Sequence, residues 1–140
     1  MEILSRLLYR AEANGDIEGI KISRGGPQIT HLLFADDLLL LTQSTTANIT
    51  AIKSIMDKFC NWSGQEINCA KSGLFFSKNA TSDSKRNAKA ILGIRKLKED
   101  ARYLGNPLFI KRKWKESFQF LIEKIRNKLA AWKTKALSWA

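Results

Sequence analysis

The chain has 140 residues, 44% of them hydrophobic and 26% charged, with only 8 Gly and 2 Pro. This composition is typical of a globular domain and excludes collagen-like, low-complexity and largely disordered chains. No apolar run approaches the ~20 residues of a membrane-spanning helix, and charged residues interrupt positions 1–15, where a signal peptide would be apolar. Two cysteines, Cys60 and Cys69, without a nearby histidine, indicate neither a zinc site nor a disulfide framework. We therefore expect an intracellular protein, cytoplasmic, nuclear or both, that is not secreted.

The charge is distributed unevenly along the chain. The net charge is +11, but residues 1–70 carry 6 Lys/Arg against 8 Asp/Glu, whereas residues 71–140 carry 18 against 5. Such a positive excess favours a polyanionic partner, and we expect the second half to bind nucleic acid. One alternative is a merely soluble surface, although a smaller net charge suffices for solubility. An anionic membrane surface is a weaker alternative, because we expect the basic helices to leave no large apolar face for lipid.

The first half predicts two helices and a hairpin. Apolar residues at helical spacing predict a helix over 1–13 that Asn14-Gly15 ends. Alternation predicts a strand over 17–23, and the apolar runs 28–35 and 38–42 predict a hairpin with Asp36-Asp37 at its tip. Ser44-Thr45-Thr46 is typical of a helix cap, and Ser63-Gly64 ends that helix. Its expected apolar face consists of Ile49, Ile52, Ile55, Met56, Phe59, Cys60 and Trp62.

The second half predicts short strands and two helices. We expect strands over 67–69 and 73–76, a basic helix over 82–92 closed by Gly93, and an extended segment over 102–110 broken by Gly105 and Pro107. From Trp114 to Trp132 the apolar residues recur at steps of 4, 3, 1, 3, 4 and 3, which predicts a long amphipathic helix.

The most informative segment is the pair Asp36-Asp37 among apolar residues. Two like charges ~4 Å apart repel by about 4 kcal/mol at an effective dielectric constant of 20, and burying them unpaired would cost more. A divalent cation at the hairpin tip would absorb this charge. Asp is also a good residue for an ordinary turn, but the favoured two-residue turns have Gly at the second position. We therefore favour a metal site.

Here the sequence resembles a known family. Phe34-Ala35-Asp36-Asp37 between two apolar strands is similar to the metal-binding motif of reverse transcriptases of non-LTR retrotransposons, especially the plant LINE type. Residues 1–5 resemble the helix after that family's template- and nucleotide-contacting motif, and residues 63–72 resemble its next conserved block. Residues 103–108 are similar to the primer grip, and residues 129–138 to the thumb helix. These blocks occur in the family's order and cover most of the chain.

The resemblance implies roles for particular residues. Asp36 would bind the catalytic Mg²⁺ (or Mn²⁺) ions with Asp37 as an auxiliary carboxylate, and Lys71 would lie near the nucleotide phosphates as a proton donor to pyrophosphate. Tyr103, Leu104 and Gly105 would hold the primer backbone. Chemically, carboxylates suit two-metal phosphoryl transfer, and a cationic tract suits duplex phosphates. We assign the tract to Lys111, Arg112, Lys113, Lys115, Lys124 and Lys128.

Several of these residues have simpler interpretations. Lys71 could be an ordinary solvated side chain, and Tyr103 a core aromatic with its hydroxyl at the rim. Packing is a better interpretation than base stacking for Trp114 and Trp132, because both lie on the apolar stripe. His31, the single histidine, is interpreted as a strand residue without chemistry.

Together these patterns predict an α+β fold. We expect a palm-type antiparallel sheet with a metal-binding hairpin and flanking helices over 1–110, followed by a basic amphipathic thumb helix over 111–140. The expected function is that of a fragment of an RNA-directed DNA polymerase, which would use an RNA template, a DNA primer and deoxynucleoside triphosphates, and no membrane. We expect the fragment to be inactive alone, because the family's first metal-binding aspartate and its fingers lie upstream of the matching region. The missing upstream segment is then a further possible partner. The alternatives are a non-catalytic nucleic-acid-binding remnant and a domesticated interaction module.

Overall fold

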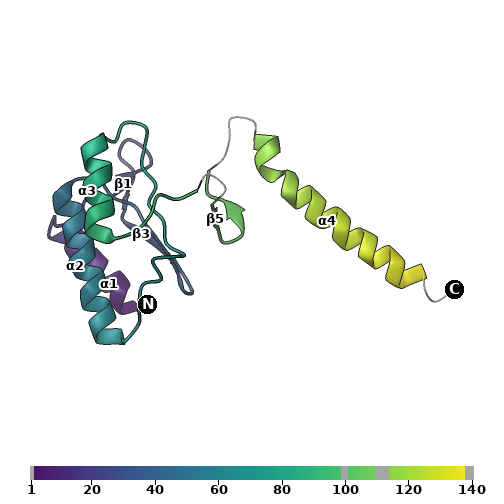
Figure 1. Cartoon of the computed structure of the whole chain (residues 1–140), viewed down its shortest axis with the longest axis horizontal. Coiled ribbons are helices and arrows are strands. Elements are labelled where there is room, and N and C mark those ends of the chain that lie inside the picture. Colours follow the sequence, from purple (N-terminus) through teal and green to yellow (C-terminus); the bar gives the residue numbers. More distant parts are fainter. Residues whose placement is uncertain (1, 99–100, 110–113, 138–140) are drawn as a thin grey trace. The chain divides into compact units, whose positions relative to one another are not determined.

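The computed structural model describes residues 2–98, 101–109 and 114–137. The chain divides between Lys98 and Glu99 into two compact units, each described here by itself (Figure 1). The helices are α1 (Glu2–Ala13), α2 (Thr46–Ser63) and α3 (Ser82–Leu92) in the first unit and α4 (Trp114–Leu137) in the second. The strands are β1 (Ile20–Lys21), β2 (Gln28–Ile29), β3 (His31–Phe34), β4 (Asp37–Leu40), β5 (Arg102–Tyr103) and β6 (Asn106–Pro107).

The described strands form three antiparallel pairs, β1–β2, β3–β4 and β5–β6. The chain is therefore a mixed helix and strand protein with antiparallel pairing, as the expected α+β class requires. Figure 1 shows α1, α2 and α3 gathered together beside the strands of the first unit.

The strands are shorter than the sequence predicts. The strand expected over 17–23 contains only β1, and the run expected over 28–35 is divided at Thr30 into β2 and β3. The segment 67–69 is not a strand, and within 73–76 only Leu74 forms a bridge, to Lys96. The predictions for 17–23 and 28–35 were thus confirmed in part, and those for 67–69 and 73–76 were wrong. The reason is that a short apolar run becomes a strand only where a partner strand lies beside it, and the partner is set by the tertiary fold.

The helix boundaries follow local capping chemistry and confirm the predictions. Thr45 begins α2 by accepting a hydrogen bond from the Asn48 amide on its side-chain oxygen, and Gly64 ends the helix in the left-handed conformation at φ 68°. The same arrangement bounds α3, where Thr81 is the N-cap and Gly93 the C-cap at φ 67°.

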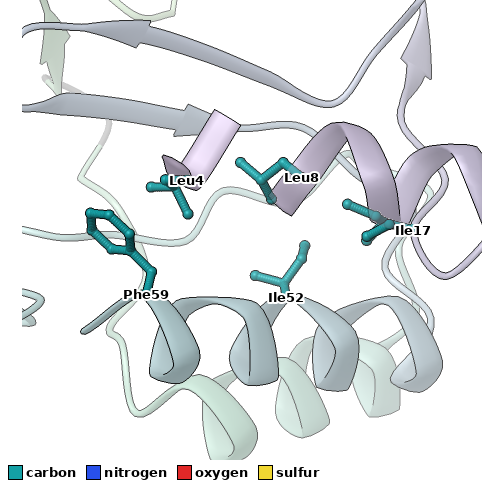
Figure 2. Packing of buried hydrophobic residues seen from close by; sticks show 6 residues of the cluster. Leu4, Leu8, Ile17, Ile52 and Phe59 are labelled. Carbon is teal, nitrogen blue, oxygen red and sulfur yellow. The ribbon is translucent and has the colours of Figure 1, made fainter. Parts of the chain in front are cut away.

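The core of the first unit lies between α1 and α2. Leu4 and Leu8 from α1 are 1% and 0% exposed, and Figure 2 shows them facing Ile52 and Phe59 of α2, with Ile17 at the same cluster. Apolar burial of this kind is the main favourable term in folding.

The expected apolar face of α2 needs one correction. Trp62 is 62% exposed rather than buried, and the Lys58 ammonium lies 5.3 Å from the centre of its ring. A tryptophan next to the end of a helix can be placed on the apolar face by spacing alone, but no element of the described first unit packs over it here, so it remains at the surface.

The second unit contains the β5–β6 hairpin and α4. The segment expected to be extended over 102–110 is extended in β5 and β6, and the predicted break at Gly105 is confirmed: the chain turns back at Leu104 and Gly105, which have φ values of 51° and 79°. The break predicted at Pro107 was wrong, because Pro107 lies within β6. Two consecutive positive φ values are typical of the tight turns that match the twist of a hairpin. The Arg102 guanidinium lies 3.9 Å from the centre of the Phe120 ring, which joins this hairpin to α4. Among the described helices, none is long and apolar enough to cross a membrane.

Candidate functional site

The β3–β4 hairpin positions the two aspartates. Its register pairs Phe34 with Asp37, so the two-residue turn consists of Ala35 and Asp36. Ala35 has φ 49°, a left-handed conformation that a non-glycine residue rarely adopts. The prediction of Asp36-Asp37 as the turn was therefore wrong by one residue: Asp36 is in the turn, and Asp37 is the first residue of β4.

Both carboxylates are exposed to solvent, and they are adjacent in the chain at one end of the hairpin. Among the described residues, no group of three or more His, Cys, Asp or Glu side chains could hold a metal ion. The hairpin therefore offers two hard oxygen donors, which suit Mg²⁺ or Mn²⁺ chemically but fill only part of a coordination shell.

The two faces of this hairpin differ in their surroundings. Leu38 and Leu40 pack against the core of the first unit, whereas Phe34 and Leu32 are 61% and 45% exposed. Because Phe34 is directly opposite Asp37, their side chains share one face of the hairpin. The second carboxylate is therefore next to an exposed apolar surface.

The other face of β3 is held to α1 by a hydrogen-bonded cluster that the sequence did not predict. The Ser5 hydroxyl lies 2.8 Å from Nε2 of His31, and the Thr30 hydroxyl lies 3.0 Å from Nδ1. The Thr30 hydroxyl also donates to the Glu12 carboxylate at 3.2 Å. The Tyr9 ring packs edge-on against the imidazole, with 4.8 Å between the two ring centres. We call these five residues the His31 cluster.

The donors and acceptors of the His31 cluster can all be assigned. Because the Thr30 hydroxyl donates to Glu12, it can only accept from Nδ1 of His31, which must carry the ring proton. Nε2 then accepts from the Ser5 hydroxyl. Burial lowers the pKa of His31 below its ordinary value of 6.5, although the Glu12 carboxylate acts in the opposite direction. The neutral imidazole is therefore the form that the fold favours.

Spacing along α1 explains why one helix carries both the core and this cluster. Leu4, Leu8 and Ala11 form its buried stripe. One position after each of them comes a residue of the His31 cluster, namely Ser5, Tyr9 and Glu12. These three form a second stripe, about 100° around the helix from the buried one. A polar stripe beside an apolar one is a signal that the sequence contains, but the partner residues, Thr30 and His31, could be found only from the fold.

The remaining predicted residues lie in several places. Lys71 is exposed, in a turn where its amide donates to the Asn68 side chain at 3.1 Å. In the second unit, Tyr103 is half-buried in β5, and Leu104 and Gly105 form the hairpin turn. The structure thus brings Asp36 and Asp37 together in one unit and residues 103–105 together in the other.

The predicted cationic tract is described only in part. Lys124 and Lys128 are exposed and separated by one turn of α4. Lys115 belongs to the first turn of α4, where only the backbone is described. Lys111, Arg112 and Lys113 lie outside the described residues. The ion pairs found among the described residues, Arg6–Glu2, Lys53–Asp57 and Arg86–Asp83, are all in the first unit.

Comparison with known proteins finds a similarity over a short stretch of the chain. A stretch of 36 residues is 53% identical to an uncharacterized mitochondrial protein of Arabidopsis thaliana, AtMg01250. The match covers 26% of this chain and 30% of that protein. No family model and no solved structure matches the chain.

We predict that His31 makes the stability of the first unit depend on pH. Because burial lowers the pKa of the folded imidazole, the unfolded chain binds a proton first as the pH falls. At pH values above 6.5, the ordinary pKa of histidine, the neutral imidazole contributes its full share to the free energy of unfolding. This contribution should decrease as the pH falls below 6.5, and the decrease should level off once the folded imidazole is also protonated. Urea unfolding across this pH range, compared with His31→Gln, measures the contribution.

The chain has a single histidine, so its imidazole resonance reports this pKa directly. Glu12→Gln should lower the pKa further by removing the opposing charge, whereas Glu2→Gln, an exposed acid of the same helix, should leave it unchanged. A wild-type pKa at or above 6.5 would contradict the burial argument.

Proposed function

We propose that this chain is part of an RNA-directed DNA polymerase of the LINE type of non-LTR retrotransposons. In this proposal residues 1–110 belong to the palm and residues 111–140 begin the thumb. The observation that carries the proposal is the β3–β4 hairpin, in which the motif Phe34-Ala35-Asp36-Asp37 leaves two carboxylates exposed beside an apolar face. The order of the other similar blocks and the positive charge of the second half support the same function.

Asp36 and Asp37 would hold the catalytic ions, Mg²⁺ or Mn²⁺. When bound, such ions neutralise charge on the reacting phosphate and lower the pKa of the attacking hydroxyl. The two carboxylates fit this task as hard oxygen donors, and a further carboxylate from another strand would have to complete the site. The exposed face with Leu32 and Phe34 would support the end of the primer beside Asp37.

Other residues would handle the substrates. Lys71 is exposed and able to approach the nucleotide's phosphates, where its ammonium would donate a proton to pyrophosphate. The turn at Leu104 and Gly105, with Tyr103, would hold the primer backbone. The RNA template and DNA primer would bind to the cationic tract, which includes Lys124 and Lys128. We place this activity inside the cell, in the cytoplasm or the nucleus.

We predict that the hairpin binds divalent metal weakly through its two carboxylates. Paramagnetic Mn²⁺ should broaden the amide resonances of residues 34–38, and Asp36→Asn with Asp37→Asn should abolish this broadening. The double variant should also be slightly more stable without metal, because like-charge repulsion between exposed groups is small but unfavourable. Asp16→Asn, an exposed acid in the turn after α1, is the matched control. Lower metal-free stability of the double variant would mean that the aspartates have a structural role instead.

We predict that the 140-residue chain alone does not extend a primer on poly(rA)/oligo(dT) with either metal, because two carboxylates do not hold both ions of the two-metal mechanism. Adding the family's upstream palm and fingers segment, in cis or in trans, should allow extension that Asp36→Asn abolishes. Extension by the complemented enzyme that persists in Asp36→Asn and in Asp37→Asn would overturn the assigned catalytic role.

A second candidate function is nucleic-acid binding without catalysis. It is favoured by the positive charge of the second half, which carries 18 Lys/Arg against 5 Asp/Glu. This function needs only phosphate contacts, which give affinity without sequence specificity. Binding without extension in the complemented enzyme would select it over the polymerase.

We predict that the full chain binds an RNA–DNA hybrid with a strong dependence on salt. Each phosphate neutralised contributes a slope of about −0.9 on B-form DNA in a log–log plot. Lys124→Gln with Lys128→Gln should make the slope shallower by about 2. Lys21→Gln with Arg24→Gln removes the same charge from an exposed part of the first half and should change little. Equal affinity at low and high salt, or equal effects of the two pairs, would refute an interface in the second half.

A further inference from the structure

Helix α4 carries a row of large apolar side chains that remain at the surface. Ile122, Ile125, Leu129 and Trp132 are 46%, 59%, 53% and 76% exposed. The expectation that the basic helices leave no large apolar face is therefore wrong for α4. A contiguous exposed apolar surface of this kind marks an interaction site in a soluble protein.

The spacing of this row is that of a coiled-coil seam. Six apolar residues of α4 follow one another at alternating steps of four and three residues: Phe118, Ile122, Ile125, Leu129, Trp132 and Ala136. This alternation averages 3.5 residues, which is the heptad repeat, with the six residues at the a and d positions. The six residues, which we call the seam, span about 27 Å of helix.

The second unit's own packing uses the opposite side of α4. Phe120 occupies an f position, which faces away from the a and d positions of a heptad. The Arg102 guanidinium of the β5–β6 hairpin lies over this ring at 3.9 Å. The contact that joins hairpin and helix therefore does not cover the four seam residues that are exposed, Ile122, Ile125, Leu129 and Trp132.

The residues flanking the seam decide what that molecule can be. Arg126 and Lys128 occupy e and g positions and are exposed, and Lys133 and Lys135 occupy the next e and g positions in the sequence. The e and g residues of two paired helices face each other and set partner choice. A second copy of α4 would place cations against cations, which is destabilising, whereas a partner with carboxylates there would be favoured.

We propose that α4 pairs through its seam with an amphipathic helix of another protein, one with apolar a and d residues and Glu or Asp at e and g. Nucleic acid supplies anions for the flanks but little apolar surface to cover four large exposed side chains. A lipid surface supplies both, but it has no helical repeat that would require alternating steps of four and three. The occupant that satisfies spacing and flanking charge together is an acidic helix.

The test uses the full chain and two synthetic helices of four heptads, both with Ile at a and Leu at d. One probe carries Glu at every e and g position and the other carries Lys. Calorimetry should show that one Glu probe binds per chain. The affinity for the Lys probe should be at least about tenfold lower. Arg126→Glu with Lys128→Glu should reverse this preference, because it exchanges attraction for repulsion at the flanks.

The seam itself is tested by Ile125→Asn with Leu129→Asn, which should lower the affinity for the Glu probe at least about tenfold. Ala130→Asn with Ala131→Asn adds the same two side chains outside the seam and should change the affinity less than about twofold. Circular dichroism confirms that α4 stays helical in both variants.

Three outcomes would overturn the proposal. The first is equal binding of the Glu and Lys probes. The second is an unchanged affinity of the seam variant for the Glu probe. The third is that the chain does not bind the Glu probe but binds a different partner through the seam. That partner would be phosphatidylserine-containing vesicles, an RNA–DNA hybrid or a second copy of the chain, and its binding would be lost in the variant Ile125→Asn with Leu129→Asn.

Discussion

The packing of α1 against α2 is the interaction on which the first unit depends. Leu4 and Leu8 are its most completely buried large side chains, and they face Ile52 and Phe59 across the helix interface. Truncating a buried leucine to alanine costs about 2–5 kcal/mol, a large part of the stability of a domain of this size. The two residues therefore fix α1 in one place, and everything that α1 carries is positioned with it.

What α1 carries is the hydrogen-bonded stripe that holds β3. Ser5 and Glu12 satisfy the polar groups of His31 and Thr30, while Leu38 and Leu40 of β4 pack against the core. One face of the hairpin is thereby attached to the fold, which leaves its other face, with Phe34 and Asp37, directed to solvent. The exposed carboxylates are thus positioned by a strand pair that is itself attached to the core, which is the kind of support that the proposed metal site would need.

The second unit combines positive charge with an exposed apolar seam, and these two features suit different partners. Phosphates need only the cations, such as Lys124 and Lys128, whereas the seam needs an apolar surface. If both interactions exist, they compete for Lys128, which flanks the seam. An acidic helix bound to α4 would then reduce the binding of nucleic acid by Lys128. The two proposals are therefore coupled through this side chain.

The sequence by itself determined the helices, because their signals are local. Thr45, Gly64, Thr81 and Gly93 act on backbone groups within four residues of themselves, and no distant contact is needed to interpret them. The antiparallel hairpin at residues 31–40 was also predictable, since two apolar runs flanked the aspartates. The motif that resembles reverse transcriptases was equally visible, but its function stays a proposal.

Only the tertiary structure decided the strand lengths, the turn and the His31 cluster. A strand needs a partner to satisfy its backbone hydrogen bonds, so the runs at 67–69 and 73–76, without a neighbouring strand over their length, did not become strands. The hairpin register placed Ala35 rather than Asp37 in the turn. The interpretation of His31 as a strand residue was confirmed, but its hydrogen bond with Ser5, 26 positions away in the sequence, and the effect of Glu12 on its pKa could not be predicted. Contacts over such separations exist only after the chain has folded, and sequence periodicity, which reports neighbours within one or two turns, does not contain them.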